Sequence, residues 1–212
     1  MTRMGVIGSG GVGQVLAGGL KKHGYEVRIG SRSPAKLDEF SKTSGIANGT
    51  FADVAAWAEG IVLAVEGGAA EDALRAAGAA NLSGKLVIDA TNPISKEPPE
   101  DGVIKFFTGP NDSLMERLQQ TFADTRFVKA FNSVGQGLMV NPDLPGTPTM
   151  FYCGNDAAAK AATARIIEQF GWEPADMGTV KAARALEPLC QLWCIPGFLR
   201  NQWVHAFHLM RK

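Results

Sequence analysis

A glycine-rich run, Gly8-Ser9-Gly10-Gly11-Val12-Gly13, has the spacing G-x-G-x-x-G and stands between an apolar segment and a segment with helical periodicity. In this setting the first glycine permits a tight turn, the second lets a ligand approach the backbone, and the last lets a helix pack closely on a strand. Free N–H groups where the helix begins favour an anion. We therefore expect residues 8–13 to bind the pyrophosphate of a dinucleotide; the alternative is a glycine-rich turn without a ligand.

A second group of polar side chains follows the next expected strand, in Gly30-Ser31-Arg32-Ser33-Pro34-Ala35-Lys36. An Asp or Glu at this position accepts hydrogen bonds from a ribose 2′-hydroxyl and repels a 2′-phosphate, and no acid is present. Ser31, Arg32 and Lys36 instead supply a hydroxyl, a guanidinium and an ammonium, which suit a phosphate dianion. The sequence predicts NADP(H) rather than NAD(H), with a solvated pair of surface cations as the alternative.

The nicotinamide end of such a ligand is expected at the turns after the fourth, fifth and sixth strands, because ligands cross the carboxyl ends of an open α/β sheet. The candidate contacts there are small or amide side chains: Ala64, Val65, Asn92, Asn132 and Val134. For the two asparagines, a role in forming the turn and a contact with the nicotinamide are both open.

A carbonyl or alcohol substrate normally needs a proton donor or acceptor at its reacting oxygen, and these turns carry no good candidate. Lys129, within a strand, and Lys181, at the start of a helix, are expected to be surface charges. His205 and His208 are expected at the rim, near the end of a C-terminal helix. We therefore predict no catalytic side chain, and a second redox cofactor, whose own ring takes the hydride, as the acceptor.

Segments typical of strands alternate with segments typical of helices in the first part of the chain, which predicts a Rossmann-type, doubly wound parallel α/β sheet over residues 1–132. A helix is also expected to begin at Ser33-Pro34, with serine as N-cap. The expected strands are residues 3–8, 25–30, 46–50, 60–65, 85–90 and 126–131, and the other helices are residues 11–23, 51–59, 69–80 and 112–122.

Residues 133–212 are expected to form a small C-terminal α/β unit ending in helices. A loop rich in Gly and Pro precedes a strand at 149–153, a helix at 156–170 and a strand at 173–177. Residues 180–210 are predicted to be helical with an interruption at Pro196-Gly197. The apolar side chains of this last stretch must be buried, either on the chain's own sheet or in a dimer interface that also roofs the acceptor pocket.

Basic and acidic residues balance at 21 each among 212 residues, which argues against a nucleic-acid or polybasic membrane surface. Cys153, Cys190 and Cys194 lack a metal-ligand spacing and are expected to be reduced thiols, so no metal is predicted. No leader and no apolar run of roughly 20 residues is evident, so we expect a cytoplasmic location without a membrane anchor.

Several sequence blocks in order resemble the NADPH-dependent reductases of the deazaflavin coenzyme F-420 (F420H2:NADP oxidoreductases), and the same module is similar to the reductase domain of six-transmembrane metalloreductases. The blocks are residues 8–13, 30–32 with Lys36, 128–132, 151–156 and 183–189. The resemblance implies that Ser9, Ser31, Arg32 and Lys36 hold the 2′-phosphate and that residues 132–135 lie beside the nicotinamide and the acceptor ring. It also implies a homodimer through the C-terminal helices.

One position departs from the family: characterised deazaflavin reductases carry a histidine after the sixth strand, where this chain has Asn132. The expected function is hydride transfer between NADPH and F-420 or a flavin-like acceptor. An NADPH-binding sensor or scaffold without turnover is the first alternative. A small carbonyl or imine reductase is the second, and it predicts a longer all-helical C-terminal region.

Overall fold

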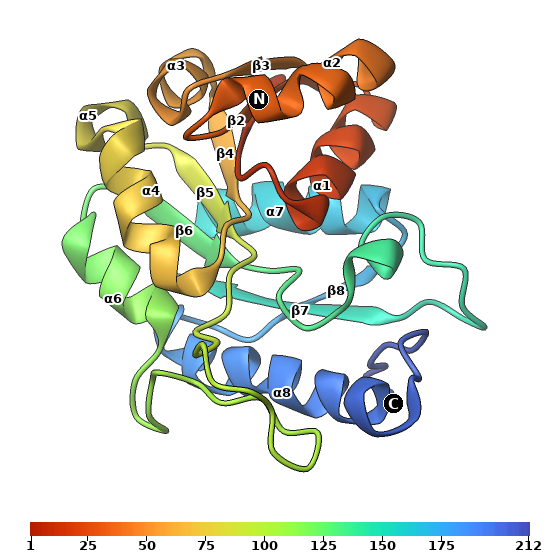
Figure 1. The fold of residues 1–212 in the computed structure, drawn as a ribbon. Helices are drawn as coiled ribbons and strands as arrows, with labels where there is room; N and C mark the ends of the chain where they lie inside the picture. Colours follow the sequence, from red (N-terminus) through yellow and green to blue (C-terminus); the bar gives the residue numbers. More distant parts are fainter.

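The computed structural model describes all 212 residues and contains one eight-stranded sheet with helices on both faces (Figure 1). The strand order is β3-β2-β1-β4-β5-β6-β7-β8; β7 runs antiparallel to β6, and all other neighbours are parallel. The predicted doubly wound α/β fold is confirmed. The strands are β1 (Arg3–Ile7), β2 (Glu26–Gly30), β3 (Ala47–Gly49), β4 (Gly60–Leu63), β5 (Leu86–Asp89), β6 (Arg126–Lys129), β7 (Thr149–Gly154) and β8 (Glu173–Asp176).

The crossover helices lie close to their expected positions, and none of the helices is long and apolar enough to cross a membrane. The sheet continues without a break past residue 132, since β7 pairs with β6. The division into two units at this residue therefore stays a prediction. The helices are α1 (Gly11–Lys22), α2 (Asp38–Ser44), α3 (Phe51–Trp57), α4 (Ala70–Ala77), α5 (Ala79–Leu82), α6 (Leu114–Thr121), α7 (Ala157–Gln169) and α8 (Ala183–Arg200), with short 3-10 turns η1 (Pro34–Leu37), η2 (Gly67–Ala69), η3 (Gln136–Leu138) and η4 (Val180–Ala182).

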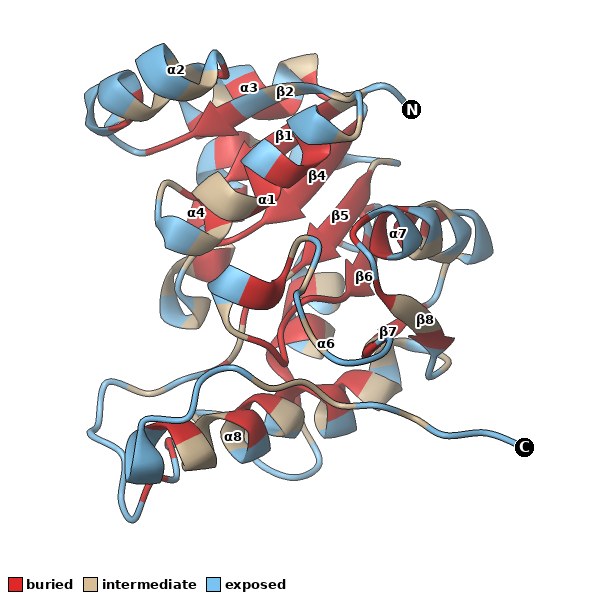
Figure 2. Ribbon diagram, turned by 90° about the vertical axis from the view of Figure 1, so that its right-hand side faces the viewer, coloured by how far each residue is buried: buried red, intermediate tan, exposed pale blue.

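The central strands are buried on both faces, as continuous apolar runs require in a sheet covered by helices (Figure 2). Val6, Val62 and Ile88 belong to one buried cluster, whereas Ile61 and Val87 belong to another. Adjacent residues of a strand point to opposite faces, so each strand contributes to two cores. Because β1, β2, β4, β5 and β6 run parallel, their carboxyl ends meet at one edge of the sheet.

Two helices of the structure differ from the helices that the sequence predicts. Ser33 does not cap a helix with its side chain: η1 comes first, and α2 begins only at Asp38. The side chain of Ser31 accepts a hydrogen bond from the Ser33 N–H (3.1 Å), which holds this segment as a turn. The crossover expected at 69–80 is divided into α4 and α5 by Gly78, whose φ of +90° is a left-handed conformation that favours glycine.

The expected interruption at Pro196-Gly197 is wrong, as is a second helical segment after it. Helix α8 is continuous through Pro188 and Pro196, and residues 201–212 are not helical. Each proline lacks an N–H group, but burial of one face of α8 compensates for the lost hydrogen bond. The tail turns back instead, and Thr149 N donates to Phe207 O (2.9 Å) at the start of β7.

The interpretation of Lys129 as a surface charge is also wrong. Lys129 is fully buried on β6, beside Asp89 on the neighbouring rung of β5. Its Nζ atom lies 2.7 Å from Asp89 Oδ2 and 3.0 Å from Glu187 Oε1 of α8, and it donates to Thr91 O (2.8 Å). We call these three side chains, Lys129, Asp89 and Glu187, the buried ionic cluster.

The buried ionic cluster joins four elements of the fold. The Glu187 carboxylate also accepts hydrogen bonds from Leu114 N and Met115 N (both 3.0 Å), at the start of α6. Burial alone would lower the pKa of Lys129, but the charges of Asp89 and Glu187 hold this pKa above its ordinary value. The ammonium is therefore charged, and it ties the ends of β5 and β6 to α6 and α8.

Replacing Lys129 with methionine should lower the free energy of unfolding by about 3–5 kcal/mol, because two buried carboxylates lose their counter-charge. The measurement is urea unfolding followed by circular dichroism. Lys181→Met is the control: Lys181 is exposed, and its loss should change stability by no more than about 0.5 kcal/mol. Equal small effects of both substitutions would contradict the assigned role of the cluster.

Candidate functional site

In the glycine-rich turn between β1 and α1, each glycine of the motif has a structural role of its own. Gly8 has φ +137°, and a Cβ atom there would lie 2.1 Å from Ala64 O. A Cβ on Gly13 would lie 2.1 Å from Gly8 O, whereas a Cβ on Gly10 would meet nothing within 4 Å. Gly8 and Gly13 thus allow close packing inside the protein, and Gly10 leaves its outer side open.

The start of α1 is available to an anion. Its N-cap is Gly10, so no side chain caps the helix, and its first turn carries no acid. Backbone N–H groups at such an end attract phosphate or carboxylate groups. The turn therefore has the open backbone and the positive end of a helix that the pyrophosphate of a dinucleotide requires.

Two hydroxyl groups meet at the ends of β1 and β2. Ser31 is buried, and its Oγ donates to Ser9 Oγ across 3.4 Å. Arg32 and Lys36 follow in the chain, both exposed, and neither forms an ion pair within the chain. The four residues predicted to read a 2′-phosphate are thus contributed by neighbouring segments, with both cations free to bind it.

The turns after β5 and β6 are tied to each other by their asparagines. Asn92 Nδ2 donates to Asn132 O (2.7 Å), and Asn132 Nδ2 donates to Asn92 Oδ1 (3.1 Å) and to Leu186 O of α8 (2.9 Å). Both side chains therefore link one turn to another, and the bonds do not decide between a structural role and a contact with the nicotinamide. Ala64 and Val134 are buried close to these turns in the same core, and Val65 is half-buried.

The backbone at the end of β6 is unusual. Phe131 has φ +63°, in the left-handed region that a bulky side chain rarely adopts. Such a conformation persists only where the surroundings fix it, and it is typical of functional sites. It turns the chain sharply just before Asn132, which carries the loop across the end of the sheet.

The two C-terminal histidines are not on a helix, contrary to expectation. The His205 ring stacks on Trp193 with centroids 5.0 Å apart, and its Nε2 lies 3.0 Å from Trp193 O. His208 Nδ1 lies 2.9 Å from Thr147 O. Both rings hold the C-terminal tail against its neighbours, and neither is placed as an acid for the nicotinamide turns.

The three cysteines are not joined in a disulfide. All three are free, as predicted, and Cys153 and Cys190 are buried. Burial raises the pKa of Cys153 to about 12, so its thiol stays protonated. The structure holds no group of three or more His, Cys, Asp or Glu side chains arranged to bind a metal ion.

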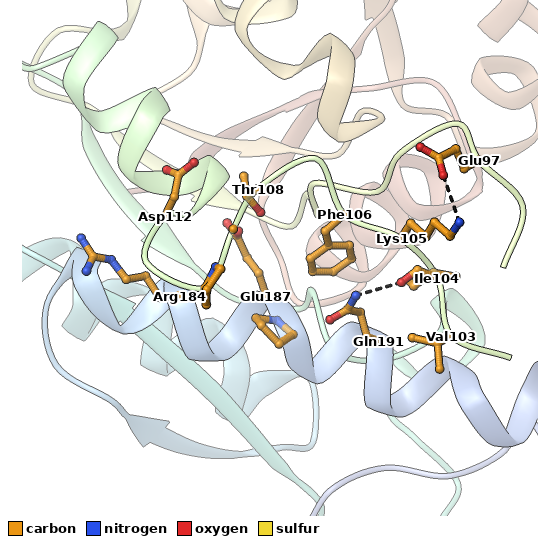
Figure 3. A pocket seen from close by; sticks show the side chains of 13 residues that line it. Glu97, Val103, Ile104, Lys105, Phe106, Thr108, Asp112, Arg184, Glu187 and Gln191 are labelled. Atoms are coloured by element: carbon orange, nitrogen blue, oxygen red, sulfur yellow. Dashed lines mark hydrogen bonds and ion pairs between the residues drawn. The ribbon is translucent and has the colours of Figure 1, made fainter. Parts of the chain in front are cut away.

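A separate hollow of about 560 Å³ lies between the long connection after β5 and helix α8 (Figure 3). Some of its polar side chains are paired within the lining: Lys105 Nζ lies 3.1 Å from Glu97 Oε2, and Gln191 Nε2 donates to Ile104 O (2.8 Å). No motif in residues 91–112 indicated it. Because it shares no lining residue with the glycine turn, it is not the dinucleotide site.

Comparisons with known proteins agree with this geometry. The family described as NADP oxidoreductase coenzyme F420-dependent matches residues 3–93, which span β1 to β5 and include the glycine turn. A crystal structure from Arthrobacter sp. FB24, provisionally assigned as an F420-dependent NADP reductase, is 34% identical, with a TM-score of 0.90 over 100% of both chains.

Two curated relatives carry the same module. Metalloreductase STEAP3 of Rattus norvegicus is 28% identical over 93% of this chain and 39% of its own length. The F420-dependent NADP reductase of Methanocaldococcus jannaschii is 26% identical over 52% of this chain and 50% of its own. The chain thus spans half or less of the length of these relatives. By its likeness to the Arthrobacter structure over both full chains, it belongs to the family of coenzyme F420-dependent NADP oxidoreductases.

Proposed function

We propose that the chain transfers hydride between NADP(H) and a deazaflavin such as F-420, or a flavin-like ring. One observation carries the proposal: the carboxyl edge of the sheet offers an open, cationic nucleotide turn at one end and the small or amide side chains of Ala64, Asn92 and Asn132 at the other. The first feature suits NADPH, and the second suits an acceptor that needs orientation rather than an acid.

The residues present fit NADP(H) at this edge. Residues 8–13 would hold its diphosphate through backbone N–H groups, and Ser9, Ser31, Arg32 and Lys36 would hold its 2′-phosphate. The nicotinamide would lie beside Ala64, Val65, Asn92, Asn132 and Val134. When bound, NADPH supplies the hydride. The chain's own part is to align two rings and to keep the Asn92 and Asn132 turns at a fixed spacing.

The nature of the acceptor is inferred from chemistry and from the relatives' names. The archaeal relative is described as F420-dependent, and the rat relative as a metalloreductase. Asn132 replaces the histidine expected after β6, and its amide is already bonded to Asn92 and Leu186 O. A neutral, fixed amide orients an acceptor ring without exchanging protons with it, which favours a deazaflavin or flavin over a carbonyl compound.

The alternatives differ in what they require. A carbonyl or imine reductase would need a proton donor at the pocket, whereas Asn92 and Asn132 at the ends of β5 and β6 are neutral amides. A sensor or scaffold would keep the nucleotide site and lack turnover. Measurement of turnover distinguishes such a sensor or scaffold from an enzyme that transfers hydride.

Stopped-flow oxidation of NADPH with F-420, FMN, FAD and a set of small carbonyls tests the proposed acceptor class. We expect F-420 or a flavin to accept hydride and the carbonyls to be inactive. Oxidation by carbonyls alone would overturn the proposal, and tight NADPH binding without turnover by any acceptor would favour the sensor.

Replacing Arg32 with alanine should weaken NADPH binding about tenfold to a hundredfold and leave NADH nearly unchanged, because one charge-assisted contact is worth roughly 1.5–3 kcal/mol. Fluorescence titration gives both dissociation constants. Arg28→Ala is the matched control, since Arg28 lies on β2, shortly before Arg32 in the chain, and stacks on Trp57 (4.5 Å to the ring centroid). An equal loss for NADPH and NADH would contradict the role of Arg32.

The proposed partner is a second copy of the chain. Leu192 and Leu199 lie exposed on one stripe of α8, near the exposed Phe198. A contiguous apolar surface of this kind is typical of an interface. Leu192→Glu should convert a dimer to a monomer in sedimentation velocity, whereas Ala158→Glu on the exposed side of α7 should not. A wild-type chain that sediments as a monomer would disprove the dimer.

A further inference from the structure

The loop after β6 returns to the start of α1, and the residues on both sides of Gln136 are held by packing contacts. Before it, Gly135 packs so closely on Trp193 that a Cβ atom would lie 2.6 Å from the ring. After it, Met139 is buried, and its carbonyl accepts a hydrogen bond from Trp172 Nε1 (3.1 Å). The side chain of Gln136 itself is exposed.

The Gln136 carboxamide lies on the first residue of α1. A Cβ atom on Gly11 would be 2.1 Å from Gln136 Oε1 and 2.8 Å from its Nε2. The neighbouring Gly10 faces open space. The side chain of Gln136 forms no hydrogen bond within the chain, although its donor and acceptor atoms stand at the edge of the diphosphate turn.

The contact also accounts for a glycine that the motif does not require. In G-x-G-x-x-G, residue 11 is a free position, yet this chain has Gly11 there. Any larger side chain would displace the carboxamide, because the clash is with the Gln136 side chain and not with backbone. Gly11 and Gln136 thus form a matched pair across the opening.

We propose that Gln136 is a ligand of the cofactor: its Nε2 donates to a diphosphate oxygen of NADP(H). An amide donor suits this place because it satisfies an anionic oxygen without adding a charge. Because Asn132 belongs to the same loop, this one loop would then border both the diphosphate and the acceptor side of the cofactor. This inference rests on the proposed position of the diphosphate at residues 8–13.

The test is nucleotide binding, measured by fluorescence titration without any acceptor. Gln136→Ala should raise the Kd for NADPH about tenfold, because a hydrogen bond to a charged group is lost. Gln136→Glu should raise it further, because a carboxylate would face the diphosphate, and added salt should reduce that loss. Gln120→Glu is the control, since it makes the same charge change on the exposed side of α6.

Binding of three nucleotides distinguishes a contact of Gln136 with the diphosphate from a contact with the 2′-phosphate. NADPH and NADH share the diphosphate and should lose affinity equally in both Gln136 variants, whereas 2′-AMP, which lacks the diphosphate, should bind as in wild type. Wild-type affinity of Gln136→Ala and Gln136→Glu for NADPH would overturn the inference, as would an equal loss of 2′-AMP. Failure of every acceptor in the turnover assay would leave these binding ratios intact, so the two proposals fail separately.

Discussion

The buried ionic cluster is the constraint on which the rest of the carboxyl edge depends. Lys129 is fully buried, so its charge is tolerable only while Asp89 and Glu187 remain in contact with it. These contacts fix the ends of β5 and β6, the start of α6 and the first half of α8 in one arrangement. Lys129 also holds the Thr91 carbonyl, immediately before Asn92. The geometry of the acceptor-side turns therefore follows from an electrostatic requirement beneath them.

The two halves of the edge are built by different means. The nucleotide half relies on missing side chains, since Gly8 and Gly13 allow close packing and Gly10 leaves backbone exposed. The other half relies on side chains that bond to each other, since Asn92 and Asn132 join two turns and attach them to α8. A flexible dinucleotide can adapt to the first half, whereas hydride transfer needs the fixed spacing that the second provides.

The sequence was sufficient for features whose cause is local. Each of three patterns predicts the structure of its own segment: the glycines at fixed spacing, the cations after β2 and the apolar runs. The structure places those segments as expected. It was insufficient where partners are distant: the acids that neutralise Lys129 lie on β5 and α8, and a lysine in a strand gives no sign of them. The prolines of α8 were misleading for the same reason, because packing on the sheet outweighs local helix propensity. Gln136 belongs to no sequence motif, and its place beside the glycine turn becomes evident only because its loop returns to Gly11 in the structure.

The most direct test of this account is a crystal structure of the chain with NADP+ bound. The account predicts diphosphate density between residues 8–13 and Gln136, the 2′-phosphate at Ser31 and Arg32, and the nicotinamide beside Asn92 and Asn132. A nucleotide bound instead in the hollow between the residue 97–112 connection and α8 would contradict it. So would a nicotinamide directed away from the Asn132 loop.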